Sequence, residues 1–592
     1  ESPSGEKLYE YLDSHEKYSG ATYHDARKEY AIVTKERLKH HKSQTNANMI
    51  TDLLKYLKKN NMLQAIFFSF STNNCEKYAK SVGIDLIDYS ESAEIQRIFD
   101  KHIVQFADRY KHVADIQIMK DLLLKGIAFH HSGMLGILKE IVEIIFKQGL
   151  LKVLFATETF AVGVNTPTRT VVFTEIQKFT AKGRRFITSA EYKQMSGRAG
   201  RRGYDTYGTI IYLPLYDLPD EEDMKAVVLG DYPEIKSKFN PSYQFYLKVV
   251  QSGATNLQTF FDKSLARYEN KKHLSSMLSD HNKLSSDIND IDSRAALHVN
   301  NMDSINTVIK YDSMNIGNTT GFKIILSSKQ QKEYKKAQST INANPELKDT
   351  FQLVLKKTEM KTQLRILSDN IRNISEYLDV SCLQIRKILI DWGYITGSGS
   401  GQTVLKDVQT KGIIAAQINE CNPIILTEMI CSDSFTNMTP EEIVAMISIF
   451  VEPVKIRVNG SSDWNDFDFD GTPEIHNKIK MIVDRIDVMK QIEESTIGQN
   501  SNFGNWNYHT GYIDVSYMWA CGTDVPTILK KLGNMGEYVG KFVKNMLKIS
   551  NILHNVRSII KMIGKIELIP AIEQADKLIM RDIVAVTSLY LL

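Results

Sequence analysis

The 592-residue sequence lacks several features that would point to particular classes of protein. Its five cysteines are scattered and never form a CxxC pair, which argues against a zinc site or a disulfide framework and indicates a reducing compartment. No apolar run reaches about 18 residues, so we expect no transmembrane helix and no membrane partner. The net charge is only +3, so any nucleic-acid binding must come from local patches.

A phosphate-binding P-loop is also missing, because the pattern G-x-x-x-x-G-K-[ST] occurs nowhere in the chain. Two stretches imitate ATPase motifs. The stretch GSGSGQT (397–403) has no lysine at the required place, and we interpret it as a turn between two short strands. The stretch DEED (220–223) follows Pro219 and no buried strand, so we interpret it as the start of a surface helix. The chain begins without Met and without a signal peptide, and we expect a fragment.

From residue 65 to residue 214, short β-rich runs alternate with helical segments. Between the second and third runs, LGILKEIVEIIFKQG has apolar residues at helical spacing and ends at Gly149. This alternation predicts a parallel sheet covered on both faces. Ligands of such sheets bind at the carboxyl ends of the strands, and we expect the loops after residues 156 and 174 to converge there with residues 194–205. The predicted strands are AIFFSF (65–70), IAFHH (127–131), KVLFA (152–156), TVVFT (170–174) and TIIYLP (209–214).

Beyond about residue 241 the strand signals fade and helical patterns dominate. Residues 255–380 predict two long helices with a small insertion near the turn, at 312–328. Residues 376–408 predict a helix, a turn, a helix and a strand pair, and residues 410–592 are mostly helices with apolar periodicity. The predicted fold is therefore multidomain: an α/β parallel-sheet domain followed by a mostly α-helical part.

The stretch LLKVLFATETFAVGVNTPTRTVVF (150–173) is the first candidate site. A buried strand ends at Ala156, and Thr157 and then Gly163 follow it. Hydroxyls and backbone amides at a strand end are suited to grip phosphates, and a glycine lets the backbone approach closely. The alternative is an ordinary strand–loop–strand crossover.

The stretch QMSGRAGRRGYD (194–205) is the second candidate, and we refer to it as the arginine loop. Gln194, Arg198 and Arg201 recur at spacings of four and three, so in a helical turn they share one face. Arginine suits planar contact with phosphate oxygens and neutralises charge in phosphoryl transfer. The alternative is a solvated basic turn, which the three interleaved glycines make less attractive.

Four stretches, taken in chain order, resemble motifs IV to VI of superfamily 2 helicases. More narrowly, TETFAVGVN followed by QMSGRAGRRG is similar to the superkiller and exosome-associated (Ski2-like) branch of the DExH RNA helicases. DNA-repair relatives carry a different motif V and usually lack the second arginine of RRG. The four stretches are QAIFFSFSTNNCEKYAKSV (64–82), GIAFHHSGMLGILKEIVE (126–143), FATETFAVGVNTP (155–167) and EYKQMSGRAGRRGYD (191–205).

The resemblance continues toward the C-terminus. Residues 239–270 resemble the start of the family's winged-helix region, and residues 405–453 and 578–591 resemble its C-terminal helical (DSHCT) domain. The resemblance thus implies a RecA-like sheet domain, a winged helix and a helical bundle. The expected domains are the end of a preceding domain or linker (1–60), a second RecA-like domain (61–235), the start of the winged-helix region (236–272), a helical stalk with a reduced insertion (273–360), the end of the stalk with a winged-helix-like segment (361–408) and the DSHCT ratchet domain (409–592).

The resemblance implies catalytic roles for Arg201, as an arginine finger reaching the γ-phosphate of ATP, and for Arg198 and Gln194, which assist it. It also implies that Gly163 and Asn165 line the nucleotide cleft. The cofactors it implies are ATP and Mg²⁺, whose ligands we expect in a first RecA-like domain outside this sequence. The chain alone is therefore expected to be inactive as an ATPase.

For nucleic acid, the resemblance implies that Thr157 contacts the backbone and that His131 and Ser132 face the RNA strand. The alternative for the histidine pair of FHHSG is a polar cap at a strand end, and we expect no metal site. The stretch GEYVGKFVKNMLKISNIL (536–553) resembles the ratchet helix. Lys541, Lys544 and Lys548 share one face of it, although that face is equally consistent with simple solvation.

The function implied is an ATP-dependent RNA helicase of 3′-to-5′ polarity that acts on single-stranded RNA in decay or processing. Residues 271–359 leave little room for the family's arch insertion, which argues against arch-dependent exosome partners. We expect an intracellular protein, cytoplasmic or nuclear, and the Lys/Asn/Ile-rich composition also fits a viral origin. Two alternatives stay open: a DNA-repair-type helicase, and a non-catalytic scaffold that binds RNA or protein through a helicase body.

Overall fold

The computed structural model describes most of the chain and divides it into two compact units. The first unit comprises Glu1–Glu234, Gln417–Met489 and Asn505–Leu592, and the second comprises Ile235–Ala416 and Lys490–Gly504. The residues described are 8–37, 42–163, 167–180, 183–201, 203, 205–253, 260, 262–295, 303, 306–307, 327–397, 405–452, 473–498, 503–585 and 589. Within these ranges, no helix combines the length and the apolar character needed to cross a membrane.

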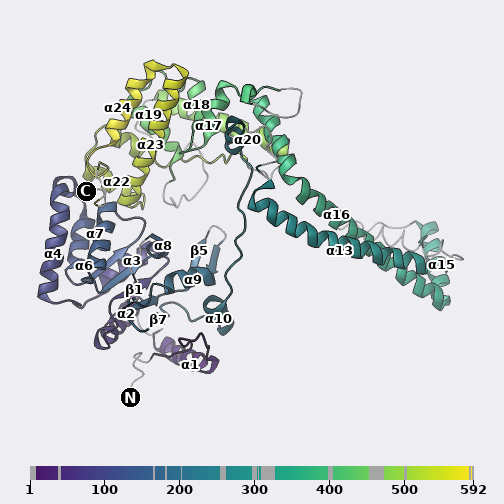
Figure 1. Ribbon diagram of the computed structural model, residues 1–592, viewed down its shortest axis with the longest axis horizontal. Coiled ribbons are helices and arrows are strands. Elements are labelled where there is room, and N and C mark those ends of the chain that lie inside the picture. Colours follow the sequence, from purple (N-terminus) through teal and green to yellow (C-terminus); the bar gives the residue numbers. More distant parts are fainter. Residues whose placement is uncertain are drawn as a thin grey trace. The chain divides into compact units, whose positions relative to one another are not determined.

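A five-stranded parallel sheet is the core of the N-terminal part of the first unit (Figure 1). Its strand order is β2-β3-β1-β4-β7, and all four neighbouring pairs are parallel. These are the five strands predicted from the sequence. The first four are buried at every position, which explains their nearly continuous apolar runs. The strands are β1 (Ala65–Phe68), β2 (Ile127–His130), β3 (Val153–Ala156), β4 (Thr170–Phe173) and β7 (Thr209–Tyr212).

Several of the helices around this sheet begin at residues suited to capping, whereas α6 and α7 begin after Val113 and Leu135, which have no capping side chain. Ser71 accepts a hydrogen bond from the N–H of Asn74, and Asp88 forms a reciprocal capping box with Glu91. Asp220 precedes α10, which confirms that DEED begins a helix. The helices are α1 (Gly20–Arg37), α2 (Lys42–Lys59), α3 (Thr72–Ser81), α4 (Tyr89–Ile103), η1 (Val104–Phe106), α5 (Ala107–Tyr110), α6 (Ala114–Leu123), α7 (Gly136–Lys147), α8 (Glu158–Gly163), α9 (Ser189–Ser196) and α10 (Glu221–Leu229).

A small antiparallel hairpin, absent from the sequence prediction, projects between β4 and α9. It consists of β5 (Gln177–Thr180) and β6 (Gly183–Phe186). Ion pairs tie it to its neighbours: Lys178 Nζ lies 2.7 Å from a carboxylate oxygen of Glu158 and 2.7 Å from one of Glu191. Arg185 pairs with both oxygens of Glu191 at 2.8 Å. Glu191 therefore connects the hairpin to the first turn of α9.

The rest of the first unit is a helical bundle, as the DSHCT resemblance implies. Trp519 is buried, donates its indole N–H to the carbonyl of Ile579 at 2.9 Å and packs edge-on against Phe542. The elements are α18 (Pro423–Cys431), α19 (Pro440–Ile447), η4 (Ser448–Phe450), α20 (Pro473–Ile497), α21 (Ile513–Ala520), α22 (Val525–Asn534), α23 (Val539–Ile563), η6 (Ile566–Leu568) and α24 (Ile569–Ile579).

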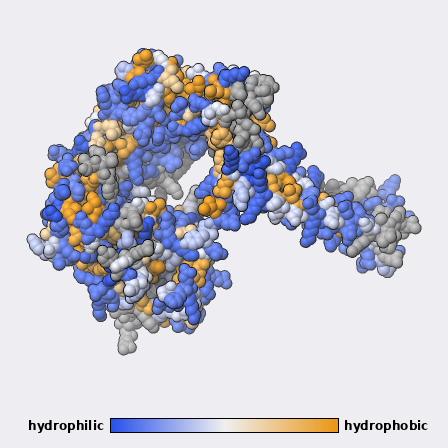
Figure 2. Space-filling model, in the orientation of Figure 1, coloured by the Kyte–Doolittle hydropathy of each residue, from blue (hydrophilic) through white to orange (hydrophobic). Residues whose placement is uncertain are grey.

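The second unit is built on a long helical hairpin, as predicted for residues 255–380. Its helices pack through apolar residues such as Ile288 and Met360, and the face shown in Figure 2 is mostly hydrophilic. Most of the predicted insertion lies outside the described residues. The predicted turn between two helices at the start of residues 376–408 is wrong, because α16 runs without a break from Pro345 to Asp391. Ile395 and Val408 form an isolated antiparallel bridge, whereas residues 398–404 are not described, so the winged helix stays a prediction. The elements are α11 (Tyr243–Gln251), α13 (Leu265–Ala295), α15 (Ser328–Ala343), α16 (Pro345–Asp391), η3 (Leu405–Asp407) and α17 (Thr410–Gln417).

The first turn of α23 lies in close contact with the loop after β2. The N–H of Gly540 donates to the carbonyl oxygen of Gly133 at 3.1 Å. A Cβ at Gly540 would lie 2.0 Å from the carbonyl oxygen of Met134, and a Cβ at Gly133 would lie 2.7 Å from Cγ of Tyr538. Glycine at both positions therefore permits this contact between the sheet domain and the bundle.

We predict that Gly540→Ala destabilises the protein by about 1–3 kcal/mol, because the new methyl group must displace backbone. Gly533→Ala is the matched control, since its Cβ would meet no atom within 4 Å and alanine is the better helix former. Urea unfolding followed by circular dichroism measures both. Equal stability of the two variants would contradict the close contact.

We predict that Glu191→Gln lowers stability by about 1 kcal/mol at pH 7. Arg185 first, and then Lys178 and the N–H of Thr188, hold the pKa of the Glu191 carboxyl well below its usual range. A lowered folded-state pKa stabilises the protein above the unfolded-state value of about 4.3, and this contribution is lost as the pH falls below that value. Thermal unfolding should therefore separate wild type from variant at pH 7 and progressively less below about pH 4. Glu222→Gln, an exposed carboxyl on α10, should show no such gap.

Candidate functional site

The arginine loop lies at the amino end of β4. Thr168 and Ala199 form a parallel bridge, and the N–H of Gly200 donates to the carbonyl of Thr168 at 2.7 Å, just before β4 begins. The prediction that this loop lies at the carboxyl end of the sheet, with the loops after residues 156 and 174, is therefore wrong as to place, although Arg198 does contact Ala161 in the segment after residue 156. The reason is that α9 starts near the carboxyl end of the sheet, where Ile187 bonds to Ile176, and runs back to the opposite end.

Close backbone packing fixes the position of the loop. A Cβ at Gly208 would lie 2.4 Å from the carbonyl carbon of Ala199, a contact that no side chain tolerates. Gly200 has a φ of +90°, in the left-handed region that favours glycine, and it faces the backbone of Gly208. These glycines let the loop lie directly against the segment that leads into β7.

Arg201 is held by a carboxylate of its own loop. Its Nε and Nη2 donate to the two oxygens of Asp205 at 2.8 and 3.0 Å, and its backbone N–H donates to Asp205 at 3.0 Å. Arg169 donates to the same carboxylate through Nε at 3.0 Å and also bonds to the carbonyl of Asn61. The side chain of Asp205 is 3% exposed and that of Arg201 is 32% exposed. The Arg201 contact, followed by that of Arg169, lowers the pKa of the Asp205 carboxyl, which is therefore ionised at neutral pH.

The other predicted nucleotide-facing residues lie near the same end of the sheet. Arg198 donates from Nη2 to the carbonyl of Ala161 and so connects the arginine loop to α8. Gln194 is exposed on α9, and Gly163 is the exposed last residue of α8. Asn165 lies outside the described residues. Of the five residues, four are thus carried by α8, α9 and the arginine loop, and Arg198 joins the two helices.

Thr157 lies at the opposite, carboxyl end of the sheet. It directly follows β3, and its N–H donates to the carbonyl of His130 at 3.1 Å. Its hydroxyl lies 2.9 Å from that of Thr159, and its side chain is largely buried. Thr157 therefore presents a hydroxyl-bearing turn at the strand end, as predicted.

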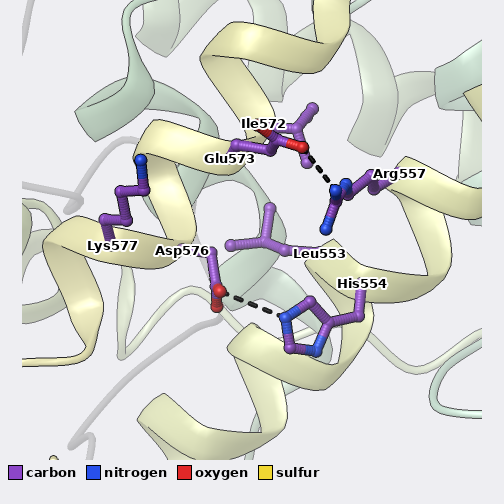
Figure 3. Close-up of a pocket in the computed structure, with 7 residues that line it drawn as sticks. All are labelled: Leu553, His554, Arg557, Ile572, Glu573, Asp576 and Lys577. Carbon is purple, nitrogen blue, oxygen red and sulfur yellow. Dashed lines mark hydrogen bonds and ion pairs between the residues drawn. The ribbon is translucent and has the colours of Figure 1, made fainter.

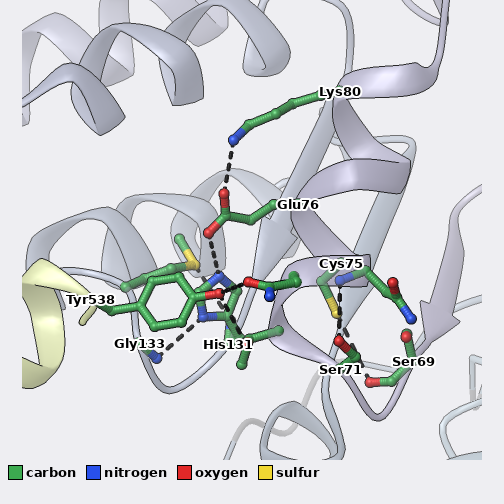
Figure 4. A network of polar contacts seen from close by, with 12 residues as sticks. Ser69, Ser71, Cys75, Glu76, Lys80, His131, Gly133 and Tyr538 are labelled. Carbon is green, nitrogen blue, oxygen red and sulfur yellow. Dashed lines mark hydrogen bonds and ion pairs between the residues drawn. The ribbon is translucent and has the colours of Figure 1, made fainter. Parts of the chain in front are cut away.

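His131 is a buried packing residue in this structure, with 1% of its side chain exposed (Figure 4). Nδ1 accepts a hydrogen bond from the N–H of Gly133 at 3.2 Å, which requires the proton to be on Nε2, and Nε2 donates to Glu76 at 3.2 Å. The ring of Tyr538 lies 5.2 Å away. RNA contact by His131 stays a prediction, and it requires this network to open. Ser132, the next residue, is exposed.

Lys541, Lys544 and Lys548 form a row on α23, which we name the lysine row. Lys544 Nζ donates to the carbonyl of Ser132 at 3.0 Å, and Lys548 Nζ donates to that of Phe450 at 3.0 Å. Desolvation, and then the charge of Lys139, lower the pKa of Lys544. Lysines 541 and 548 help to lower the pKa of His509 in the same way, after desolvation. Lys544 therefore brings positive charge to the loop that contains Ser132, with Lys139 near it, whereas Lys541 and Lys548 lie near His509.

A hollow with a volume of about 270 Å³ lies between α23 and α24. Ion pairs cross it: His554 lies 3.1 Å from Asp576, and Arg557 lies 2.6 Å from Glu573 (Figure 3). The residues of α23 that line the hollow are Leu553, His554 and Arg557. At 100° per residue along the helix, they point roughly away from the lysine row. None of the predicted site residues lines it, and its charged groups are already paired with one another.

Sequence reasoning missed three parts of this arrangement: the partners of Arg201, the joint at Tyr538 and the β5–β6 hairpin. Asp205 is the last residue of the arginine loop. Its negative charge and its closeness to Arg201 in the sequence were therefore signals that could have identified it as a partner. Tyr538 donates to Thr72, 466 residues away in the chain, and no local pattern announces that contact. Within the described ranges, no group of three or more His, Cys, Asp or Glu side chains is placed to hold a metal ion.

Two family models match the chain. The helicase conserved C-terminal domain matches residues 92–203, and the DSHCT (NUC185) domain matches residues 406–587. The first match contains most of the sheet together with the arginine loop up to Gly203, and the second contains the helical bundle with the lysine row.

Named relatives agree with these matches. The chain is 38% identical over 223 residues to the DExH-box ATP-dependent RNA helicase DExH11 of Arabidopsis thaliana, which is 38% of this chain and 17% of the relative. It is 37% identical over 222 residues to the antiviral helicase SKI2 of Saccharomyces cerevisiae, again 37% and 17% of the two chains. It is 38% identical over 218 residues to the exosome RNA helicase MTR4 of Homo sapiens, 37% and 21% of the two chains.

The matching segment therefore spans only about a fifth of the length of these relatives. The positions and the order of the two matched domains agree with the motifs: a helicase C-terminal domain with an arginine loop precedes a DSHCT bundle with a lysine-bearing helix. The chain carries a helicase C-terminal domain followed by a DSHCT domain, and in this it is similar to the RNA helicases of the Ski2-like branch of superfamily 2.

Proposed function

We propose that the chain is the part of an ATP-dependent RNA helicase that binds the RNA backbone and contacts the γ-phosphate of ATP. The observation that carries this proposal is the separation of the candidate residues between the two ends of one sheet. Arg198 and Arg201 lie at the amino end of β4, whereas Thr157 and Ser132 follow the carboxyl ends of β3 and β2. The sheet domain thus has residues suited to phosphate binding at both ends of its sheet. We call the amino end the first edge and the carboxyl end the second edge.

On the first edge, Arg201 is the group that reaches the γ-phosphate of ATP, with Arg198 and Gln194 beside it. Guanidinium groups stabilise the charge that develops on the phosphoryl oxygens during transfer. ATP and its Mg²⁺ are held by a P-loop domain outside this sequence, which itself contains no such motif. The chain alone therefore does not turn over ATP.

On the second edge, Thr157, Ser132 and the lysine row bind the backbone of single-stranded RNA. Hydroxyls, exposed backbone groups and ammonium groups recognise phosphates without reading sequence. Support comes from the positive charge of Lys544 beside Ser132, with Lys139 near it, since the net charge of the whole chain is only +3 and binding of nucleic acid requires local positive charge.

Helices α8 and α9 run between the two edges. They therefore connect the residues that face the nucleotide with those that bind RNA. Arg198 bonds to Ala161 in α8, and α8 begins directly after Thr157. A shift of the arginine loop on ATP binding or hydrolysis is transmitted along α8 to Thr157. We propose 3′-to-5′ movement, which is the polarity the family resemblance implies, with hydrolysis advancing the strand.

The relatives' names favour RNA over DNA, since those reported are RNA helicases or an antiviral helicase. They favour an enzyme over a scaffold for the same reason. We propose RNA decay or processing inside the cell as the setting. The reduced insertion argues that arch-dependent partners are not shared, because α13 and α16 are separated by only about 50 residues.

We predict that Arg201→Ala, made in the natural protein with its P-loop domain, lowers ATP turnover by about 10³-fold, the usual effect of removing an arginine finger. Binding to single-stranded RNA should stay within about twofold, because Arg201 lies at the other end of the sheet. Arg97→Ala on the exposed side of α4 is the matched control. Unchanged turnover in Arg201→Ala would refute the finger assignment.

We predict that Lys541→Gln and Lys544→Gln each weaken RNA binding and reduce the salt dependence of log K by about 0.7, one phosphate contact to a single strand. Fluorescence anisotropy with a labelled oligonucleotide between 50 and about 200 mM salt measures both quantities. Lys561→Gln, on the last turn of the same helix, is the control and should leave the slope unchanged. Equal slopes for all three variants would place the RNA elsewhere.

A further inference from the structure

Asp205 is the acceptor for two arginines that come from different segments. Arg201 reaches it from the arginine loop, and Arg169 reaches it from the residue before β4. The carboxylate has four hydrogen bonds from these two residues and its side chain is shielded from solvent. Nothing in the roles assigned so far requires the second arginine.

The two arginines are not equivalent. Arg169 is fixed at its other end as well, because its Nη1 bonds to the carbonyl of Asn61. Arg201 lies between Gly200 and Gly203, whose φ angles of +90° and +85° are accessible mainly to glycine. The packing of Gly200 on Gly208 holds this backbone in place, so Arg201 leaves Asp205 by rotation of its long side chain, which is 32% exposed.

A shielded carboxylate that loses its only cation is strongly destabilised, since its charge is then neither hydrated nor paired. Here the departure of Arg201 leaves Asp205 with Arg169 at 3.0 Å. The exchange of partners therefore costs far less than the breaking of an isolated pair. A γ-phosphate with more than one negative charge is the acceptor that can draw the guanidinium away.

We propose that Asp205 is the resting acceptor for Arg201, and that Arg169 is a positioning residue which keeps Asp205 paired while Arg201 moves to the nucleotide. The proposal rests on the proposed function, because the competing acceptor is the γ-phosphate of ATP. In this proposal Asp205 and Arg169 together determine when Arg201, the arginine finger, is available to the γ-phosphate. Arg169 acts through Asp205 and does not touch the nucleotide.

The first experiment tests the resting pair without nucleotide, in the 592-residue chain. Phenylglyoxal modifies free guanidinium groups, and peptide mass spectrometry gives the rate at each arginine. Arg201 should react slowly compared with Arg372, whose side chain is 75% exposed. Asp205→Asn should raise the Arg201 rate about fivefold, because a neutral amide holds a guanidinium less strongly. Arg169→Gln should leave that rate within about twofold, and Asp231→Asn, an exposed control, should not change it.

The second experiment measures turnover at saturating ATP in the natural protein with its P-loop domain. Arg169→Gln should lower kcat about tenfold, because the departing Arg201 now leaves Asp205 unpaired. The double variant Arg169→Gln with Asp205→Asn should recover several-fold of that loss, because no unpaired charge remains. A pair that merely holds the fold predicts the opposite: the double variant would be as slow as Arg169→Gln or slower, and less stable to heat.

The outcomes separate the two proposals. A double variant that fails to recover overturns the exchange, and Arg201 labelling as fast as that of Arg372 in the wild type overturns the resting pair. Failure of the wild-type protein to hydrolyse ATP overturns the proposed function together with the exchange. The labelling result still decides in that case whether Asp205 holds Arg201.

Discussion

The backbone contact between Ala199, Thr168 and Gly208 is the constraint on which the candidate nucleotide site depends. It fixes the arginine loop against the amino end of β4 without using any side chain. The side chains of Arg198 and Arg201 make their polar contacts from this backbone, Arg198 with the carbonyl of Ala161 and Arg201 with the carboxylate of Asp205. Small residues such as Ala199 and Gly208 thus position the loop, and its arginines make the polar contacts.

A comparable contact holds the helical bundle to the sheet domain. Gly133 and Gly540 bring two backbones together, and Tyr538 fills the space beside them, donating to Thr72 and packing on His131. The loop that carries Ser132 is thereby attached to the helix that carries the lysine row. Both proposed RNA-binding segments are consequently joined by direct contacts, and the arginine loop contacts α8 through Arg198.

The sheet was predictable because its strands are buried on both faces and nearly continuous in apolar residues, as in AIFF of β1. The position of the arginine loop was predictable in principle. A loop between a helix and the following parallel strand must lie at the amino end of the sheet, and residues 197–208 are such a loop. The β5–β6 hairpin has short, basic, partly exposed strands without apolar alternation. The partnership of Arg169 with Asp205 depends on tertiary contact. No pattern within the sequence encodes either feature.

Lys544 and Lys548 each already donate one hydrogen bond to a backbone carbonyl, at Ser132 and Phe450. Each ammonium group has three protons, so donors remain for a phosphate oxygen. Folding has meanwhile restricted the rotamers of both long side chains, a cost that flexible lysines usually meet only on binding. The row is a preorganised set of cations. Its affinity for a strand should carry a smaller entropic penalty than a row of freely moving lysines of the same charge.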